Sequence, residues 1–317
     1  MKTIITPLDG SALAEGVLPY VRLLAPLLQA KVLLLRVVTD EEQQSYYLRH
    51  AADLEFELLP SDDWPHAHEA VETLTRRAES YLADQAQALR EAGLNVTTTV
   101  MVGAPDARIA EVAQRRTDPL VVMATHGYSG VRRWALGSVA DRVVHSTCAP
   151  VLLVRSGITA PDPPALKRIL VPLDGSALAA RALPVAAEIA SCAGAELVLL
   201  RALSPLDELA DSVGPPGIPL PATPKLIAEG RERARQQLLR AAGELGRKDL
   251  TITPLVEVGH PAEVIVDEAR EQRADLIVMA THGRSGLARW ALGSVADKVL
   301  HAATTPVLLV RVQEAQP

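Results

Sequence analysis

Two short segments of this 317-residue chain place glycine, serine and histidine directly after an apolar run. THGYSGVRRWALGS, residues 125–138, follows LVVMA, and THGRSGLARWALGS, residues 281–294, follows LIVMA. In each, Gly-Ser stands before an apolar, helix-like segment. A helix start offers unpaired N–H groups and the positive end of the helix dipole, and Ser138 or Ser294 adds a hydroxyl. Glycines let a ligand approach the backbone closely, so this chemistry suits a phosphate.

The same segments exclude several catalytic interpretations. The chain has neither G-x-x-x-x-G-K-[ST] nor G-x-G-x-x-G, so it lacks both common phosphate-loop signatures. A catalytic role for His126 or His282 would need an orienting carboxylate and a nucleophile, and the adjacent sequence supplies neither. We therefore expect these histidines to have a structural or phosphate-flanking role. No catalytic residue is predicted, and the pattern favours binding over fast hydrolysis.

A second doubled motif indicates a duplicated domain. PLDGSALA occurs at residues 7–14 and, letter for letter, at 172–179. MATHGYSGVRRWALGSVADR (123–142) matches MATHGRSGLARWALGSVADK (279–298) at 16 of 20 positions. Pro, Gly and Ser residues between the copies indicate a linker. The sequence predicts one domain at 1–155, a linker at 156–164 and a second domain at 165–312.

Strand-like and helix-like segments alternate in both copies, which is typical of a parallel α/β sheet. We expect Ser11 to cap the first helix, Pro19 and Pro184 to kink it in each copy, and Pro105 to open a later helix. The segments 39–70 and 204–224 are expected to be irregular. The strands of the first copy are predicted at 2–8, 31–38, 95–102, 120–124 and 150–154, and its later helices at 72–92, 106–116 and 138–146.

Composition narrows the function classes. Hydrophobic residues make up 48% of the chain and aromatic residues 3%, which suits Val-, Leu- and Ile-rich cores. The net charge of −6 argues against nucleic acid as a partner. Cys148 and Cys192 show no ligand spacing, and His66 and His68 stand in a polar run that we interpret as a solvated loop rather than a metal site. The sequence shows no signal peptide and no membrane-spanning run, so we expect a cytoplasmic protein with no protein-only metal site.

With these motifs in place, the chain resembles a tandem member of the universal stress protein (UspA-like) family. The family's ATP-binding signature is G-x-x-G-x9-G-[ST]. Here it reads A-T-H-G-x9-G-S at 124–138 and 280–294, with Ala124 and Ala280 at the first glycine. The resemblance covers almost the whole chain. It implies two Rossmann-like domains of the adenine nucleotide alpha hydrolase type, each a five-stranded parallel sheet of order 3-2-1-4-5 with helices on both faces.

The resemblance also implies a nucleotide site in each domain, with ATP as the ligand, with or without Mg²⁺. The aspartate after strand 1 would contact the nucleoside, the residue at the end of strand 2 would pack on adenine, and the glycine after strand 3 would lie near the ribose. The site of the first domain would comprise Pro7, Leu8, Asp9, Val37, Gly103, Ala124, His126, Gly127, Gly137, Ser138 and Val139. The site of the second would comprise Pro172, Leu173, Asp174, Ala202, Gly259, Ala280, His282, Gly283, Arg284, Gly293, Ser294 and Val295.

The sequence is compatible with three functions. The favoured one is an adenine-nucleotide-binding regulatory or stress-response protein with slow or no hydrolysis. The alternatives are an interaction module of the same fold that binds no nucleotide, suggested by Ala124 and Ala280, and a weak ATPase. The resemblance further implies that the two copies of PVLLV pair within the chain, and it leaves room for a homodimer and a regulatory protein partner. Because the copies differ at several site positions, we expect unequal nucleotide affinities.

Overall fold

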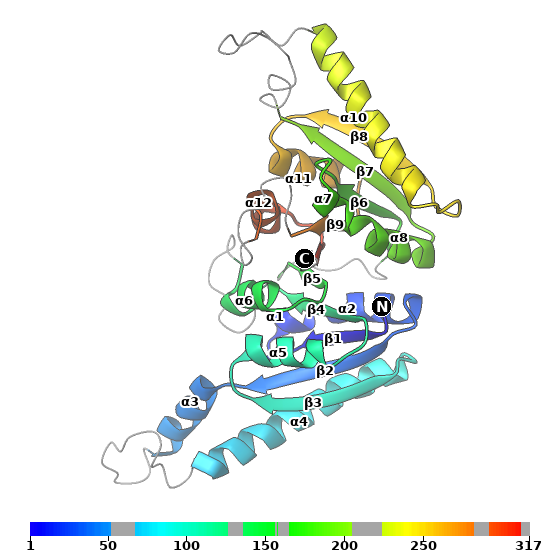
Figure 1. Ribbon diagram of the computed structural model, residues 1–317. Coiled ribbons are helices and arrows are strands. Elements are labelled where there is room, and N and C mark those ends of the chain that lie inside the picture. Colours follow the sequence, from blue (N-terminus) through cyan, green and yellow to red (C-terminus); the bar gives the residue numbers. More distant parts are fainter. Residues whose placement is uncertain are drawn as a thin grey trace, which may run out of the picture. The chain divides into compact units, whose positions relative to one another are not determined.

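The computed structural model describes residues 1–51, 67–125, 136–155, 157, 165–204, 224–281 and 292–311 (Figure 1). Its internal contacts divide the chain into two compact units. The first contains the described residues up to Thr125 together with Gly137–Ala149, and the second contains Leu136 and the described residues from Pro150 onward.

The first unit alternates strands and helices as predicted. Its four strands are parallel and lie in the order β3-β2-β1-β4, which makes β1 and β4 neighbours. Its elements are β1 (Thr3–Pro7), α1 (Ala12–Glu15), α2 (Leu18–Leu27), β2 (Lys31–Val38), α3 (Asp40–Ala51), α4 (Ala67–Glu91), β3 (Val96–Val102), α5 (Pro105–Gln114), β4 (Pro119–Ala124) and α6 (Ser138–Ser146).

The second unit repeats this arrangement and adds one strand. The order β5-β10-β9-β6-β7-β8 contains the predicted 3-2-1-4-5 order of the second repeat in full, with all five of its strands parallel. Its elements are β5 (Val151–Val154), β6 (Arg168–Pro172), α7 (Ala177–Ala180), α8 (Ala182–Ala193), β7 (Glu196–Leu203), α10 (Pro224–Glu244), β8 (Ile252–Val258), α11 (Pro261–Glu271), β9 (Leu276–Ala280), α12 (Ser294–Ala302) and β10 (Val307–Val310).

The extra strand of the second unit comes from the first repeat. β5 pairs antiparallel with β10, with Leu152 opposite Leu308, so the two copies of VLLV lie side by side. This confirms the pairing that the resemblance implied, and it makes the sheet of the second unit mixed rather than purely parallel. Because every residue of both strands is buried, neither strand alternates apolar and polar side chains.

Helices cover both faces of each sheet. The chain passes from β6 to β7 to β8 in one direction across the sheet, and from β8 to β9 in the other. Right-handed crossovers therefore put α8 and α10 on one face and α11 on the opposite face, where it packs against α12 (Figure 1). The cores are aliphatic, and residues such as Ile4, Leu34 and Ile169 are fully buried.

At the predicted kinks before Pro19 and Pro184 the helix is interrupted for one or two residues, which keep right-handed helical dihedral angles. Instead of one bent helix, each repeat has a short helix followed by a longer one. The short helices end at Glu15 and Ala180, each four residues before the proline. A proline has no N–H to bond the carbonyl four residues earlier, and its ring clashes with that carbonyl, so the first helix ends there.

Segment 39–70 is less irregular than expected, because α3 occupies its first part. Thr39 and Glu42 form a reciprocal cap at the start of this helix. Thr39 N–H donates to Glu42 Oε2 at 2.9 Å, and Glu42 N–H donates to Thr39 Oγ1 at 3.2 Å. The T-x-x-E pattern that marks such a cap is present in the sequence, and it was the signal for this helix.

Candidate functional site

The turn after the first strand of each repeat is built by an aspartate and a serine. In the second repeat, Ser176 N–H and Oγ both donate to Asp174 Oδ1, at 2.9 and 2.6 Å, and Ser176 Oγ accepts from Ala179 N–H at 3.1 Å. The serine thus caps the following helix and also fixes the rotation of the aspartate carboxylate. Asp9 and Ser11 make the same bonds at the same distances, which confirms the predicted cap.

The Gly-Ser pair after the fourth strand begins a helix, as the sequence indicated. Gly293 is the N-cap of α12 and Ser294 its first residue, and Gly293 N–H donates to Thr281 O at 2.8 Å. The dihedral angles of Gly293, φ −63° and ψ 143°, are open to any residue. Gly137 has the same role before α6, with φ −64° and ψ 147°. The backbone therefore does not require glycine at either position, and the property left to it is the absence of a side chain.

The glycine after the third strand, by contrast, is required by the backbone. Gly259 has φ +158°, and a Cβ added to it would lie 2.8 Å from Val264 Cγ2. Its N–H donates to Leu203 O at 2.9 Å and so holds the end of β8 to β7. Gly103 has φ +127° and makes the equivalent bond to Val38 O.

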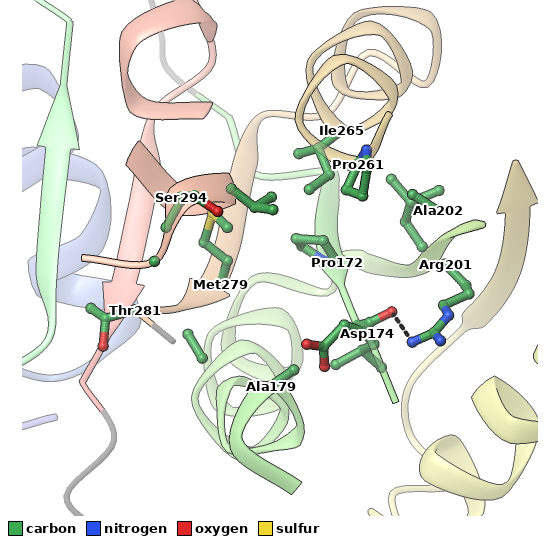
Figure 2. Close-up of a pocket in the computed structure, with 16 residues that line it drawn as sticks. Pro172, Asp174, Ala179, Arg201, Ala202, Pro261, Ile265, Met279, Thr281 and Ser294 are labelled. Carbon is green, nitrogen blue, oxygen red and sulfur yellow. Dashed lines mark hydrogen bonds between the residues drawn. The ribbon is translucent and has the colours of Figure 1, made fainter. Parts of the chain in front are cut away.

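These three turns meet at the carboxyl ends of the strands, where open parallel sheets bind ligands. In the second unit they surround a cavity of about 240 Å³. Figure 2 shows Ala202, Pro261 and Ile265 close together, with Met279 and Ser294 across from them. The described residues that line the cavity are Pro172, Leu173, Asp174, Ala179, Leu200, Arg201, Ala202, Pro261, Ile265, Met279, Ala280, Thr281, Gly293, Ser294, Val295 and Ala296.

Eight residues that the sequence assigned to the second site line this cavity. They come from four separate segments: Pro172, Leu173, Asp174, Ala202, Ala280, Gly293, Ser294 and Val295. Gly259 does not line it, although its close neighbour Pro261 does. His282, Gly283 and Arg284 lie outside the described residues.

The predicted residues of the first site occupy the equivalent positions. Pro7 ends β1 and Ala124 ends β4, while the buried Leu8 donates its N–H to Leu35 O at 2.9 Å. As in the second repeat, Asp9 follows β1, Val37 lies near the end of β2 and Gly103 follows β3. The start of α6 is formed by Gly137, Ser138 and Val139. His126 and Gly127, like His66, lie outside the described residues.

A comparison with protein families decides the assignment. The model of the universal stress protein family matches residues 1–155 and again residues 165–311. The chain belongs to the universal stress protein family. A universal stress protein of Mycobacterium tuberculosis strain H37Rv is 30% identical over 220 residues, which cover 69% of this chain and 70% of that protein. One of Thermus aquaticus is 37% identical over 145 residues, or 46% of this chain and 98% of its own.

Solved universal stress proteins share the fold of the entire chain. The crystal structure of one from Archaeoglobus fulgidus superposes with a TM-score of 0.67 at 19% identity, and covers 98% of this chain and 96% of that one. A putative universal stress protein from Pseudomonas aeruginosa gives 0.63 at 20% identity, with coverage of 98% and 93%. These likenesses establish two tandem universal stress protein folds.

Sequence reasoning missed four prominent cavity residues of this family member: Arg201, Pro261, Ile265 and Met279. Pro261 and Ile265 lie on one face of the first turns of α11, four residues apart, directly after the glycine turn. That spacing could have identified them. Arg201 precedes Ala202 on β7, and alternation along a strand would have sent its side chain to the opposite face. Its length lets the guanidinium reach the cavity, which no sequence pattern indicated.

The two units differ in the polar groups behind the aspartate turn. In the first unit, Tyr81 Oη donates to Glu15 Oε1 at 2.9 Å, and Gln85 Nε2 donates to the same oxygen at 3.3 Å. Burial, and then the Glu15 carboxylate, raise the pKa of Tyr81 well above its usual value. Asp9 contributes to this rise and Arg36 opposes it, so all these groups share one electrostatic neighbourhood.

The described ranges contain neither a metal-binding cluster nor a membrane-spanning helix. No three His, Cys, Asp or Glu side chains gather there in a way that could hold a metal ion. None of the helices described is both long and apolar enough to cross a bilayer.

Proposed function

We propose that this universal stress protein binds ATP or a related adenine nucleotide, and that it acts as a regulatory or stress-response module with slow or no hydrolysis. The observation that carries the proposal is the convergence of eight predicted residues from four segments on one cavity. The first unit would hold an equivalent site of different affinity.

The cavity suits the nucleoside part of such a ligand. Ala202, Pro261, Ile265 and Met279 give it an apolar wall against which a base can pack. Asp174 supplies a carboxylate that accepts hydrogen bonds from ribose hydroxyls or from an exocyclic amine. The volume of about 240 Å³ lies just below the usual range of small-molecule pockets, roughly 300–1,000 Å³. We therefore assign the cavity to base and ribose.

The start of α12 suits the phosphates. Its first N–H groups and the Ser294 hydroxyl stand at the cavity wall, and the N-cap Gly293 has no side chain to block them. Ala280, at the first glycine of the family signature, ends β9 in extended conformation. An alanine adopts that conformation without strain, so the departure from the signature is compatible with binding.

The charged residues described at the cavity support the proposal of slow or absent hydrolysis. Among the described residues that line the cavity, Asp174 is the only carboxylate and no histidine is present. Its Oδ1 already accepts two hydrogen bonds from Ser176, so this oxygen is engaged in the turn. Mg²⁺ would enter with the ligand's phosphates rather than through a protein cage.

The first experiment is to denature the protein as purified and to identify released nucleotides by mass spectrometry. Calorimetric titration with ATP, with and without Mg²⁺, then counts the sites. Gly293→Val is expected to remove one site and Gly137→Val the other, because both backbones accept valine while the side chain blocks the helix start. Gly243→Val, on α10 with no atom within 4 Å of the added Cβ, is the matched control and is expected to keep both sites.

Unchanged ATP affinity in a folded Gly137→Val/Gly293→Val double variant would contradict the proposal. Absence of released and added nucleotide alike would favour the interaction module of the same fold. Steady phosphate release from ATP with Mg²⁺ would instead favour the weak ATPase. Two sites of identical affinity would contradict the expected inequality of the repeats.

A further inference from the structure

The two repeats carry an arginine at the same place, near the end of the second strand. Arg36 lies on β2 and Arg201 on β7, 165 positions apart, which is also the offset between the two PLDGSALA motifs. Each directly precedes the residue that the family resemblance places against adenine, Val37 or Ala202. The two arginines nevertheless have different partners.

Arg36 is turned toward the start of α3. Its Nη2 forms an ion pair with Glu42, and its Nη1 donates to Val37 O at 2.7 Å. Glu42 is itself fixed by the reciprocal cap with Thr39. A Cβ added to Gly10 would meet no atom within 4 Å, so the guanidinium of Arg36 does not pack against this glycine.

Arg201 is turned toward the aspartate turn instead. It is 6% exposed and lines the cavity, and its Nη1 donates to Leu173 O at 3.3 Å (Figure 2). A Cβ added to Gly175 would lie 3.0 Å from the same nitrogen. The guanidinium therefore packs against the backbone on both sides of Asp174.

The charged side chains of the cavity are consistent with this packing of Arg201 against the aspartate turn. Asp174 and Arg201 are the only charged side chains among its described lining residues, and Figure 2 shows them next to each other. A buried guanidinium is stable only where hydrogen bonds and opposite charge compensate its lost hydration. The Leu173 carbonyl accepts one such hydrogen bond, and Figure 2 shows the Asp174 carboxylate, the opposite charge of the cavity, beside the guanidinium.

We propose that Arg201 is the positioning residue for Asp174, and that it makes the second site the tighter of the two. The inference rests on the proposed nucleotide function, because Asp174 must contact the ligand for its position to matter. By packing on both sides of Asp174, Arg201 holds the turn in its binding geometry before the ligand arrives. A preorganised hydrogen-bond acceptor binds more tightly than one that must be ordered first. In the first repeat, the equivalent arginine is paired with Glu42 and does not pack against Gly10.

The experiment compares Arg201→Met and Arg201→Lys with Arg36→Met in the full chain. One readout needs no ligand. Amide hydrogen exchange of the segment 172–176 is expected to rise in Arg201→Met and to recover partly in Arg201→Lys. Arg36→Met is expected to leave the equivalent segment, 7–11, unchanged.

The second readout is ATP affinity by calorimetry. Arg201→Met is expected to weaken one site by roughly tenfold, as for loss of a hydrogen bond involving a charged group. Arg36→Met is expected to change neither site. In an Asp174→Asn background, Arg201→Met is expected to cause no further loss of ATP affinity. A merely structural role of Arg201 would instead make the losses of affinity from the two substitutions additive.

Unchanged exchange in folded Arg201→Met, unchanged affinity, or additivity with Asp174→Asn would each overturn the inference. If the wild-type chain binds no adenine nucleotide, the proposed function fails on that result alone. The exchange comparison then still decides whether Arg201 holds the turn.

Discussion

The two copies of PLDGSALA are identical in sequence and in local geometry, yet they lie in different electrostatic surroundings. Asp9 and Asp174 accept the same two hydrogen bonds from their serines at the same distances. Beneath the second turn lies the guanidinium of Arg201, whereas Arg36 is paired with Glu42. Eight shared residues thus determine a turn and a cap, while residues distant in sequence determine the charges beside it.

A second difference concerns the helix behind the turn. The first repeat has the Glu15–Tyr81–Gln85 cluster. The aligned positions of the second repeat are Ala180, Gln237 and Ala241, which cannot form it. The second repeat has its own surface cluster instead, in which Asp249 binds Arg247 and Ser191. The repeats share a core and differ in the polar groups around it.

The shared core predicts the largest effects, which should be equal in the two repeats. Leu82 on α4 and Leu238 on α10 are equivalent, at 0% and 3% exposed. Leu82→Ala and Leu238→Ala are each expected to lower the free energy of unfolding by about 2–5 kcal/mol, because each leaves a cavity. Urea unfolding measures the loss. Leu239→Ala, at a position 45% exposed, is the control, and a loss confined to one repeat would break the equivalence.

One buried position differs between the repeats, and exchanging its residues should move stability in opposite directions. Thr6 is fully buried on β1, and its Oγ1 has no hydrogen-bond partner among the described residues. The equivalent residue of β6 is the fully buried Val171. Thr6→Val is expected to stabilise the protein by about 1 kcal/mol, and Val171→Thr to destabilise it by about 1–3 kcal/mol. Melting temperatures that fall in both variants would show that the Thr6 hydroxyl has a role.

The Tyr81 cluster predicts that the first repeat is the more sensitive to alkali. Because the pKa of Tyr81 is raised in the folded chain, its contribution to stability is fully present at pH values below the ordinary tyrosine pKa, near 10. The contribution is lost as the pH rises above that value, because the unfolded chain ionises first. All five tyrosines belong to the first repeat, so tyrosinate absorbance reports on it alone.

Tyr81→Phe tests this cluster directly. It is expected to remove the latest-ionising tyrosine from the absorbance titration and to lower stability at neutral pH by about 1 kcal/mol. Ala180→Glu, which places the carboxylate in the repeat that lacks the tyrosine, is the control and should confer no such titration. A titration of Tyr81→Phe that retains the late step would contradict the assignment.

The smallest effect is expected at the surface cluster of the second repeat. Hydrogen bonds from Arg247 and then Ser191 hold the pKa of Asp249 well below its ordinary value. The contribution of Asp249 to folding stability is therefore present at pH values above the ordinary aspartate pKa and is lost as the pH falls below it. Because the group is solvent-exposed, Asp249→Asn is expected to lower the melting temperature at pH 7 by about 1 °C or less. A larger change that persists in 1 M salt would show that the cluster is more than a screened surface contact.

Much of this fold could be read from the sequence. The doubled motifs predicted two copies of one α/β domain, because buried parallel strands are continuous apolar runs and the helices between them have caps and prolines at their ends. The resemblance to the family predicted eight residues of the cavity wall. Preferences of neighbouring residues also explain the two features that were predicted incompletely. Pro19 ends a helix four residues earlier, and the Thr39–Glu42 pair caps the start of α3.

Only the tertiary structure decided what surrounds the site. The sequence determined which residues follow each strand, because turn, cap and strand preferences act over a few neighbours. It did not determine the direction of Arg36 and Arg201, since a long side chain follows whichever carboxylate or carbonyl the packing brings within reach. Nor could it reveal the walls contributed by Pro261, Ile265 and Met279, because these meet only when β7, β9 and α11 pack together. The same eight letters thus yield two sites whose differences come from partners remote in the chain.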